Sequence, residues 1–366
     1  MNKPLIIAFY LPQFHPTPHN NEWWGTGFTE WTNVAKAKPL FKGHYQPKIP
    51  ADLGFYDLRL SEVREQQAEL AREAGVDGFC YWSYWFGNGK EELERPFNEV
   101  LASGKPDFPF MLCWANESWH SKFWNKDGTV EKKVLIEQEY PSDEDIVNYF
   151  NLRLPAFKDS RYIKIDNKPV FMIYEWDDYK DVSHFIKKWN ELAVEAGFDG
   201  IYFLAHLKDR ITTEKIEKIF SLGFDGMNVV RIWDATYKGQ SFLSKCFSYF
   251  KKRFLGIPHV RKYKDISQYY LGEEEKEQNI FPTLIPNWDH SPRSGKNSVI
   301  ITDSTPENFQ NHCERVLESV KDKQGVNMVF IRAWNEWGEG NYMEPDLKYG
   351  KGHIQALRNA LKKVFG

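Results

Sequence analysis

Two glutamates near the end of the chain have the type and spacing that acid–base chemistry requires. Glu336 and Glu339 lie three residues apart in the segment 334–340, where Gly338 and Gly340 favour a turn. Three-residue spacing in a turn places both side chains on one side of the backbone. Two carboxyls that converge near a desolvated sugar are driven apart in pKa, so that one keeps a proton while the other is ionised. Cleavage of a glycosidic bond requires such an acid and base pair.

Residues suited to sugar binding recur along the chain. Aromatic residues make up 16% of the 366 residues, and 14 of them are Trp. Aromatic rings stack on apolar sugar faces, while carboxylates, amides and imidazoles bond to hydroxyl groups. We expect these substrate-binding side chains: Tyr10, His15, Trp24, Trp82, Trp114, Asn116, Glu117, Glu175, Asp289, Asn335 and Trp337.

Glu117 and Glu175 form a rival pair of acids, each following a predicted strand. We expect both to bind sugar hydroxyls. If Glu336 instead worked with Glu175 across the barrel, the chemistry would be an ordinary double displacement through a covalent intermediate.

The elements that must position these residues alternate between strands and helices. Helical segments such as 61–74 and 182–196 repeat apolar residues at i, i+3, i+4 and i+7. Apolar runs of the kind that form parallel strands buried on both faces occupy 5–10, 78–84, 108–114, 169–174, 200–205, 226–232, 281–286 and 328–333. Eight such units predict an α/β fold, a single (β/α)8 barrel of the TIM type, whose functional residues follow the strands.

A repeated Gly-x-Asp-Gly sequence, at 75–78, 197–200 and 223–226, punctuates the pattern. Each copy follows a helix and precedes a strand, so its first glycine suits the left-handed position after a helix. We expect structural turns at the end of the barrel opposite the site, and no catalytic role for their aspartates.

We expect residues 1–366 to form one catalytic barrel, because no Pro-, Gly- or Ser-rich linker divides the chain. Long loops follow the first strand, 11–60, and the sixth, 233–279. Within the second, the stretch 245–264 combines seven basic residues with aromatic ones and has no acid. A basic amphipathic segment can contact a membrane surface or phosphates, although it is more often a solvated helix face beside an acidic neighbour.

Several classes of protein are disfavoured by what the sequence lacks. A net charge of −3 does not suit a nucleic-acid binder, and no run of about 18 apolar residues predicts a transmembrane helix. Neither a phosphate-binding glycine loop nor a G-x-S-x-G nucleophile motif occurs, and the histidines fit no standard metal spacing. We expect no metal or cofactor. The first residues lack a cleavage site, so we expect a cytoplasmic protein, or a periplasmic or secreted one only if a leader has been removed.

Two longer motifs resemble a known family. The sequences AFYLPQFHP at 8–16 and EWWGTGFTEWTNV at 22–34 closely resemble the WbsX-type proteins, a group related to glycoside hydrolase family 99 and found in polysaccharide biosynthesis clusters. WNEWGEG at 334–340 is similar to the catalytic loop of family 99. The resemblance covers residues 5 to about 357, and departs from the family 99 pattern at Gly338 and at 11–13.

The resemblance implies a TIM barrel with the retaining chemistry of endo-α-mannosidases, without metal or nucleotide. One carboxylate would deprotonate the sugar 2-hydroxyl, which attacks the anomeric carbon to form a 1,2-anhydro sugar. By motif position, Glu336 would be this base and Glu339 the general acid/base. Two alternatives remain: a WbsX-type glycosyltransferase of surface polysaccharide or O-antigen biosynthesis, and a non-catalytic sugar-binding barrel.

Overall fold

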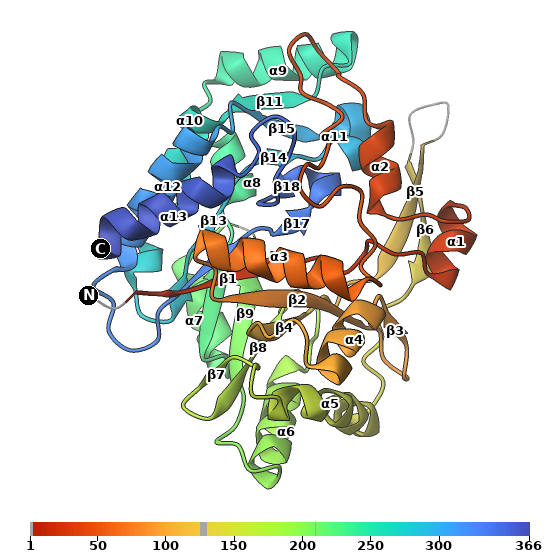
Figure 1. The fold of residues 1–366 in the computed structure, drawn as a ribbon, viewed down its shortest axis with the longest axis vertical. Coiled ribbons are helices and arrows are strands. Elements are labelled where there is room, and N and C mark those ends of the chain that lie inside the picture. The colour runs from red at the N-terminus through yellow and green to blue at the C-terminus, as the bar shows by residue number, and fades with distance from the viewer. Residues whose placement is uncertain (1–2, 125–129, 209) are drawn as a thin grey trace.

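The computed structural model of the chain describes residues 3–124, 130–208 and 210–366. At its centre, parallel strands form a barrel, as Figure 1 shows. In the order in which they pair, the strands are β12 (Ile280–Phe281), β10 (Gly226–Val229), β9 (Tyr202–Leu207), β8 (Lys168–Ile173), β4 (Phe110–Trp114), β2 (Gly78–Trp85), β1 (Leu5–Tyr10), β16 (Met328–Ile331) and β13 (Thr283–Leu284).

The two end strands of this order are halves of one kinked strand. Only Pro282 separates β12 from β13, and proline has no N–H with which to continue a ladder. The first half pairs with β10, with Met227 opposite Ile280, and the second half pairs with β16, with Thr283 opposite Phe330. The sheet therefore closes through eight strand positions, which confirms the predicted (β/α)8 barrel.

A layer of amphipathic helices covers the outside of the barrel (Figure 1). These helices are α3 (Ser61–Ala74), α4 (Arg95–Ser103), α5 (Asp143–Lys158), α6 (Val182–Glu195), α7 (Thr213–Ser221), α12 (Pro306–Val320) and α13 (Gly352–Phe365). The predicted helix 61–74 has the observed bounds, and 182–196 ends one residue late. α13 packs against both α12 and α3, so the last helix completes the ring beside the first.

The repeated glycine turns behave as expected. Gly75 directly follows α3 and Gly223 is the second residue after α7, and they adopt positive φ angles of +87° and +98°. The carboxylate of Asp77 accepts the backbone N–H of Ile6 at 2.9 Å, and that of Asp225 accepts the N–H of Phe203 at 2.8 Å. These aspartates bind neighbouring strands together, far from the strand ends that carry the site.

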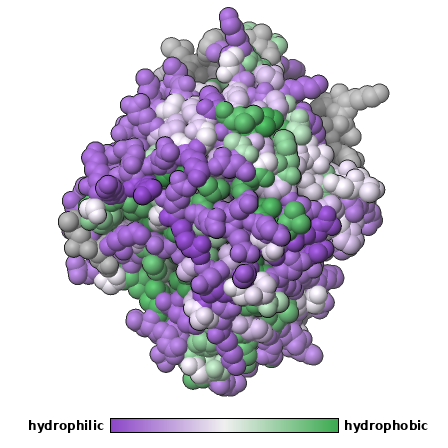
Figure 2. Space-filling model, in the orientation of Figure 1, coloured by the Kyte–Doolittle hydropathy of each residue, from purple (hydrophilic) through white to green (hydrophobic). Residues whose placement is uncertain are grey.

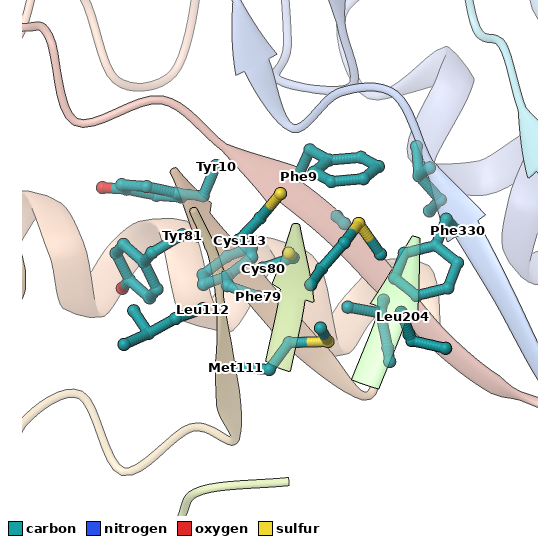
Figure 3. Close-up of a cluster of buried hydrophobic side chains, with 14 of the residues drawn as sticks. Phe9, Tyr10, Phe79, Cys80, Tyr81, Met111, Leu112, Cys113, Leu204 and Phe330 are labelled. Carbon is teal, nitrogen blue, oxygen red and sulfur yellow. The ribbon is translucent and has the colours of Figure 1, made fainter. Parts of the chain in front are cut away.

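Side chains at successive positions of a strand enter different layers of the core (Figure 3). Phe9 points into the barrel and stacks on Phe330 with ring centroids 5.6 Å apart. Its neighbour Tyr10 points out, packs 4.6 Å from Tyr81, and donates its hydroxyl to Gln67 of α3. Strand alternation therefore decides which residues can reach the barrel interior.

The loops after the strands carry further elements. α1 (Pro18–Trp24) and α2 (Glu30–Lys36) follow β1, β3 (Glu91–Glu92) follows β2, the hairpin strands β5 (Trp119–Trp124) and β6 (Val130–Ile136) follow β4, and β7 (Lys164–Ile165) precedes β8. The stretch after the sixth strand contains α8 (Ile232–Tyr237), α9 (Phe242–Leu255), β11 (His259–Lys262), α10 (Tyr263–Ile266) and two 3₁₀ turns, 267–269 and 274–276.

The long loop after the sixth strand contributes to a second, small sheet. β11 pairs with β15 (Val299–Thr302), which also pairs with β14 (Trp288–Asp289). Between β14 and β15 lie the short helix α11 (Ser291–Ser294) and a 3₁₀ turn, 295–297. The stretches after the sixth and seventh strands are thereby joined into one subassembly above the barrel.

The outer surface is mainly hydrophilic on the face that Figure 2 presents, with scattered apolar patches. Within the described residues, no helix has the length and apolar character needed to cross a bilayer.

Candidate functional site

A short hairpin after the eighth strand presents the two predicted catalytic glutamates. β17 (Asn335–Glu336) pairs with β18 (Asn341–Tyr342), and a 3₁₀ turn of residues 337–339 connects them. The side chain of Asn335 accepts the N–H of Leu11 at 2.7 Å and donates to its carbonyl at 3.0 Å, which attaches the hairpin to the first strand. Trp337 lies beneath, stacked 3.8 Å from Tyr342, with its indole N–H donated to Glu344.

Glu336 is the more deeply buried of the two carboxyls, and no cation contacts its carboxylate among the described residues. Its side chain is buried, and its Oε1 accepts the indole N–H of Trp82 at 2.8 Å. Burial and the nearby negative charge of Glu339 raise the pKa of Glu336 to about 8. Glu336 therefore carries a proton near neutral pH.

Glu339 is surrounded by cations. Its Oε1 accepts Nη1 of Arg293 at 2.6 Å and lies 3.7 Å from Nε2 of His290, while its Oε2 lies 3.7 Å from Nη2 of Arg332. Against the opposing effect of burial, Arg293 and its cationic neighbours lower the pKa of Glu339 to about 2. The pair thus holds one proton on Glu336 and one negative charge on Glu339, the reverse of the roles that motif position implies.

A third carboxylate holds Arg293 in place. Glu30, the first residue of α2, accepts Nε of Arg293 at 3.0 Å, so the guanidinium bridges Glu30 and Glu339. The carboxylate of Glu30 lies directly against Gly338, where an added Cβ would come within 1.8 Å of its Oε2. This close approach explains why glycine, a departure from the family 99 pattern, stands between Trp337 and Glu339.

A second charged cluster lies after the third, fourth and fifth strands. Lys208 contacts the carboxylate of Glu175, lies 3.8 Å from that of Glu117, and donates to the hydroxyl of Tyr174 at 3.2 Å. Burial raises the pKa of Glu175 to about 7, although Lys208 opposes that shift. Asn116 accepts the backbone N–H of Glu175 at 2.8 Å and donates to its carbonyl, so its role is to orient Glu175.

Beneath the carboxyls, the barrel interior is aromatic and rigid. Trp82 stacks on Phe9 with centroids 4.7 Å apart and meets Tyr174 edge-on. Burial and the charge of Arg332 lower the pKa of His206 well below its usual range. The neutral imidazole can therefore accept Nη1 of Arg332, 3.3 Å from its Nε2, which helps to hold Arg332 below Glu339.

Half-buried rings form an aromatic row, Tyr84–Trp119–Trp23, beside the carboxyls. Tyr84 is close enough to Glu336 for that carboxylate, together with burial, to raise the pKa of Tyr84 well above its usual range. Trp119 meets Tyr84 edge-on at 5.2 Å, and Trp23 meets Trp119 at 6.0 Å. None of these three is among the predicted contacts, because the hairpin that brings Trp119 over Tyr84 is a long-range arrangement.

Several predicted substrate contacts lie inside the protein packing. Tyr10 is bonded to α3, and Trp114 donates its indole N–H to the carbonyl of Trp85 amid aromatic side chains of α5 and α6. Asn335 and Trp337 are likewise enclosed and bonded within the hairpin. The expectation that these four residues contact the substrate is therefore wrong, because none of them has an exposed ring or amide that a sugar could reach. Their role is to hold the surrounding structure of the site in place.

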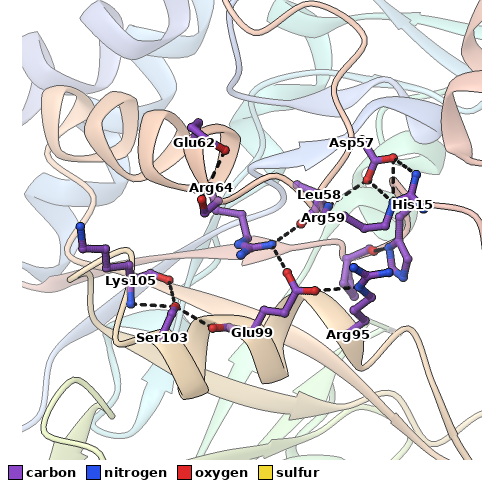
Figure 4. A network of polar contacts seen from close by, with 12 residues as sticks. His15, Asp57, Leu58, Arg59, Glu62, Arg64, Arg95, Glu99, Ser103 and Lys105 are labelled. Atoms are coloured by element: carbon purple, nitrogen blue, oxygen red, sulfur yellow. Dashed lines mark hydrogen bonds and ion pairs between the residues drawn. The ribbon is translucent and has the colours of Figure 1, made fainter.

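Three more predicted contacts lie apart from the carboxyls. His15 is buried against the carbonyl of Pro12, in the polar network of α3 and α4 drawn in Figure 4. Asp289 binds His44 and Gln46 at 2.8 and 2.7 Å, and against the opposing effect of burial His44 and the charge of Lys48 lower its pKa to about 2. Trp24 is exposed on α1, and its ring packs 5.9 Å from Phe28.

The sequence analysis did not identify the cations of the site or its third carboxylate, Glu30. Arg293, Arg332 and Lys208 follow the seventh, eighth and fifth strands, where charged residues are common, and they gain meaning only through carboxylate partners distant in sequence. Glu30 had a signal, because it stands within the N-terminal motif, but nothing local connects it with residue 339.

Within the described residues, no group of three or more His, Cys, Asp or Glu side chains is arranged to hold a metal ion. A surface hollow of about 840 Å³ lies beside α12 and α13, and none of its lining residues belongs to the carboxyl site.

Comparison with known proteins gives two kinds of match. A family model described as Glycosyltransferase WbsX matches residues 6–357. Two proteins from strains of Xanthomonas campestris pv. campestris, each described as uncharacterized protein WxcX, are 32% identical to the chain in an alignment of 367 residues that covers 98% of it. The chain spans half the length of these curated relatives.

Solved structures share the fold at low sequence identity. A glycoside hydrolase-like protein superposes with a TM-score of 0.62 at 14% identity, covering 99% of this chain and 94% of the other. A GH99 endo-α-mannosidase from Bacteroides thetaiotaomicron, in complex with bis-Tris propane, gives 0.59 at 13% identity, covering 98% and 97%. These structures share the TIM-barrel fold of the chain.

Proposed function

The chain belongs to the WbsX family, and on that premise we propose that it is a carbohydrate-active enzyme that acts on glycosidic bonds through Glu336 and Glu339. One observation carries the proposal. A single turn after the eighth strand presents two carboxyls, one protonated and one ionised near neutral pH. The specific reaction proposed is retaining hydrolysis of an α-mannoside-type glycan.

The reaction uses the sugar's own 2-hydroxyl as nucleophile. The ionised carboxylate takes the proton from O2, O2 bonds to the anomeric carbon, and the bond to the leaving oxygen breaks as the protonated carboxyl donates to that oxygen. A 1,2-anhydro sugar results. The second carboxylate then takes a proton from water, the water oxygen bonds to the anomeric carbon as the bond from that carbon to O2 breaks, and O2 recovers its proton from the first carboxyl. Two displacements at one carbon retain its configuration.

The charge states of the pair favour Glu336 as the acid and Glu339 as the base. The assignment implied by motif position requires the proton to pass from Glu336 to Glu339 when substrate binds. Each carboxyl lies close enough to shift the pKa of the other, so a proton can pass between them. The protein thus starts from one shared proton under either assignment.

Substrate contacts are proposed around the pair. Oε2 of Glu339 is buried and receives no hydrogen bond within the described part of the chain, so it can accept one from a sugar hydroxyl that reaches it. Glu117 and Glu175, oriented by Asn116 and Lys208, suit neighbouring hydroxyls. The rings of the aromatic row suit stacking on a sugar face, which contributes about 1 kcal/mol for each well-placed pair of rings.

The experiment compares Glu336→Gln and Glu339→Gln on two substrates. On an α-linked manno-oligosaccharide, both variants should lose at least about 1,000-fold in kcat, because each step needs both groups. On a glycosyl fluoride, whose leaving group needs no proton, the variant that lacks only the acid should recover the first step, measured as fluoride release in a single turnover. Recovery by Glu336→Gln supports the charge-based assignment, and recovery by Glu339→Gln supports the motif-based one. Wild-type turnover of the oligosaccharide by either variant would exclude the proposal.

Glycosyl transfer within polysaccharide assembly is the second candidate, and the description of the matched family favours it. The same acid and base pair can deliver a sugar to a hydroxyl acceptor in place of water. A nucleotide sugar that raises the melting temperature of the Glu339→Gln variant would support a transferase. An unchanged melting temperature across a panel of donors, combined with hydrolysis of glycans by the wild type, would exclude it.

A further inference from the structure

Helix α9, in the stretch after the sixth strand, exposes aromatic rings that a surface helix normally buries. Tyr249, Phe250 and Phe254 are 70%, 50% and 66% exposed. By contrast, α12 turns Phe309, Val316 and other apolar residues into the core, where they are fully buried. A contiguous exposed aromatic face usually marks a surface that binds something.

The exposed rings lie on one side of α9. Positions 249, 250, 253 and 254 share a face at the helical period, and the rings of Phe250 and Phe254 pack with centroids 4.7 Å apart. The opposite side is attached to the protein, since the hydroxyl of Ser248 bonds to Nδ1 of His259 in β11 at 2.8 Å. The aromatic face is therefore directed outward by the packing of the helix.

Basic side chains accompany these rings. The guanidinium of Arg253 lies 5.8 Å from the centre of the Phe254 ring, and the exposed Lys252 flanks the aromatic face on the side of the helix that is nearer His259. Among the described residues, neither Lys252 nor Arg253 is paired with an acid. A basic segment is more often a solvated helix face beside an acidic neighbour. These two cations do not fit that role, because they have no acidic partner among the described residues.

We propose that α9 docks the protein on an anionic lipid surface, with Tyr249, Phe250 and Phe254 in the headgroup region and Lys252 and Arg253 against lipid phosphates. Amphipathic aromatic rings suit the membrane interface, and cations beside them select anionic lipids. Such a helix lies on the membrane without crossing it.

The position of α9 gives the contact a consequence for the site. α9 and β11 lie at the same end of the molecule as β14, β15 and α11, which carries Arg293 (Figure 1). Docking through α9 brings the part of the barrel that carries the carboxyls towards the bilayer. A glycan attached to a lipid would then be within reach, whereas binding itself does not depend on the proposed chemistry.

The test is co-sedimentation of the whole chain with vesicles of phosphatidylcholine alone or with about 30% phosphatidylglycerol. The wild type should bind the anionic vesicles, and added salt should weaken binding. Lys252→Gln with Arg253→Gln should weaken it about 30-fold, the loss expected for two cations near an anionic leaflet. Phe250→Ser with Phe254→Ser should weaken it at least about tenfold.

Matched controls lie at the opposite end of the molecule. Val194→Ser with Phe220→Ser removes exposed apolar groups from α6 and α7, and Lys158→Gln with Lys187→Gln removes exposed cations from α5 and α6. Both should bind anionic vesicles like the wild type, and all four variants should keep wild-type turnover of a soluble glycan. Absent binding, equal binding to both kinds of vesicle, or equal losses in the controls would overturn the proposal. So would a concentration-dependent dimer that the α9 variants abolish, because it would assign the face to a second copy.

Discussion

At the scale of single residues, the charge of Glu339 depends on Arg293. The guanidinium contacts Glu339 at 2.6 Å, and its charge is the largest of the effects that lower the pKa of this buried carboxyl. Glu336 lacks such a cation at contact distance and keeps the proton. Two chemically identical side chains thus acquire different roles from one neighbour.

Arg293→Gln should therefore shift the acid limb of the activity profile. Without the cation, the first ionisation of the Glu336–Glu339 pair moves to higher pH, and activity is lost earlier as the pH falls. We expect a shift of at least about one pH unit in the lower limb of kcat/KM, measured from pH 3 to 9. Arg293→Lys keeps the charge and should move the limb less. An acid limb that stays in place in the Gln variant would contradict this account.

At the scale of elements, the hairpin after the eighth strand works because α2 lies directly against it. Glu30 of α2 occupies the space that a side chain at position 338 would need. The first loop can therefore pack against the hairpin of the last strand only because residue 338 is a glycine. The N-terminal and C-terminal motifs are therefore two parts of one site. Their separation of about 300 residues along the chain hides this relation from the sequence.

Gly338→Ala tests that fit. The added methyl group would displace the carboxylate of Glu30 and release Arg293, so activity should fall and unfolding should become easier by about 1–3 kcal/mol, the usual cost of overpacking. If the collision with Glu30 is the cause, Glu30→Ala with Gly338→Ala should be scarcely less stable than Glu30→Ala alone. Urea unfolding of the wild type and the three variants measures this coupling. Additive losses would show that Gly338 is needed for another reason.

At the scale of the whole molecule, buried titratable groups predict a broad stability maximum between about pH 4.5 and 6.5. Burial raises the folded-state pKa of Glu336 to about 8 and that of Glu344 to about 7, so the stability that these protonated carboxyls contribute is lost progressively as the pH rises from the unfolded pKa of glutamate, about 4.3, to those values. Burial lowers the pKa of His312 to about 3 and that of His353 to about 4. Below about pH 6.5 the unfolded chain binds protons that these buried histidines do not bind. This effect opposes that of the carboxyls down to about pH 4.5, and below that pH it lowers stability.

Urea midpoints measured from pH 4 to 9 check this maximum. Glu336→Gln should flatten the alkaline side of the profile, because the side chain that remains protonated in the fold no longer titrates. Glu69→Gln removes an acid from the exposed surface of α3 and should leave the shape of the profile unchanged. A wild-type profile that rises steadily from pH 6.5 to 9 would be inconsistent with a protonated Glu336.

The spacing of apolar residues and the sequence motifs were sufficient to predict the barrel architecture. Eight apolar runs correspond to the eight strand positions, and the helix 61–74 has the predicted bounds, because burial on two faces or on one stripe leaves a local signature. The same reasoning placed Glu336 and Glu339 together after the eighth strand. That residues 1–366 act as one catalytic unit stays a prediction.

Only the tertiary structure decided which residues face the barrel interior and what charges they carry. Phe9 and Tyr10 are adjacent in sequence, as are Cys113 and Trp114, yet in each pair one side chain points into the barrel and the other points towards the helices. The sequence shows that the side chains alternate, but which of the two faces becomes the interior is decided only when the barrel closes. The partners that set the charges, Arg293 for Glu339 and Trp82 for Glu336, lie 46 and 254 residues away from them along the chain. Electrostatic interaction depends on distance in space and on burial, so the sequence could identify the two acids but not the state of their proton.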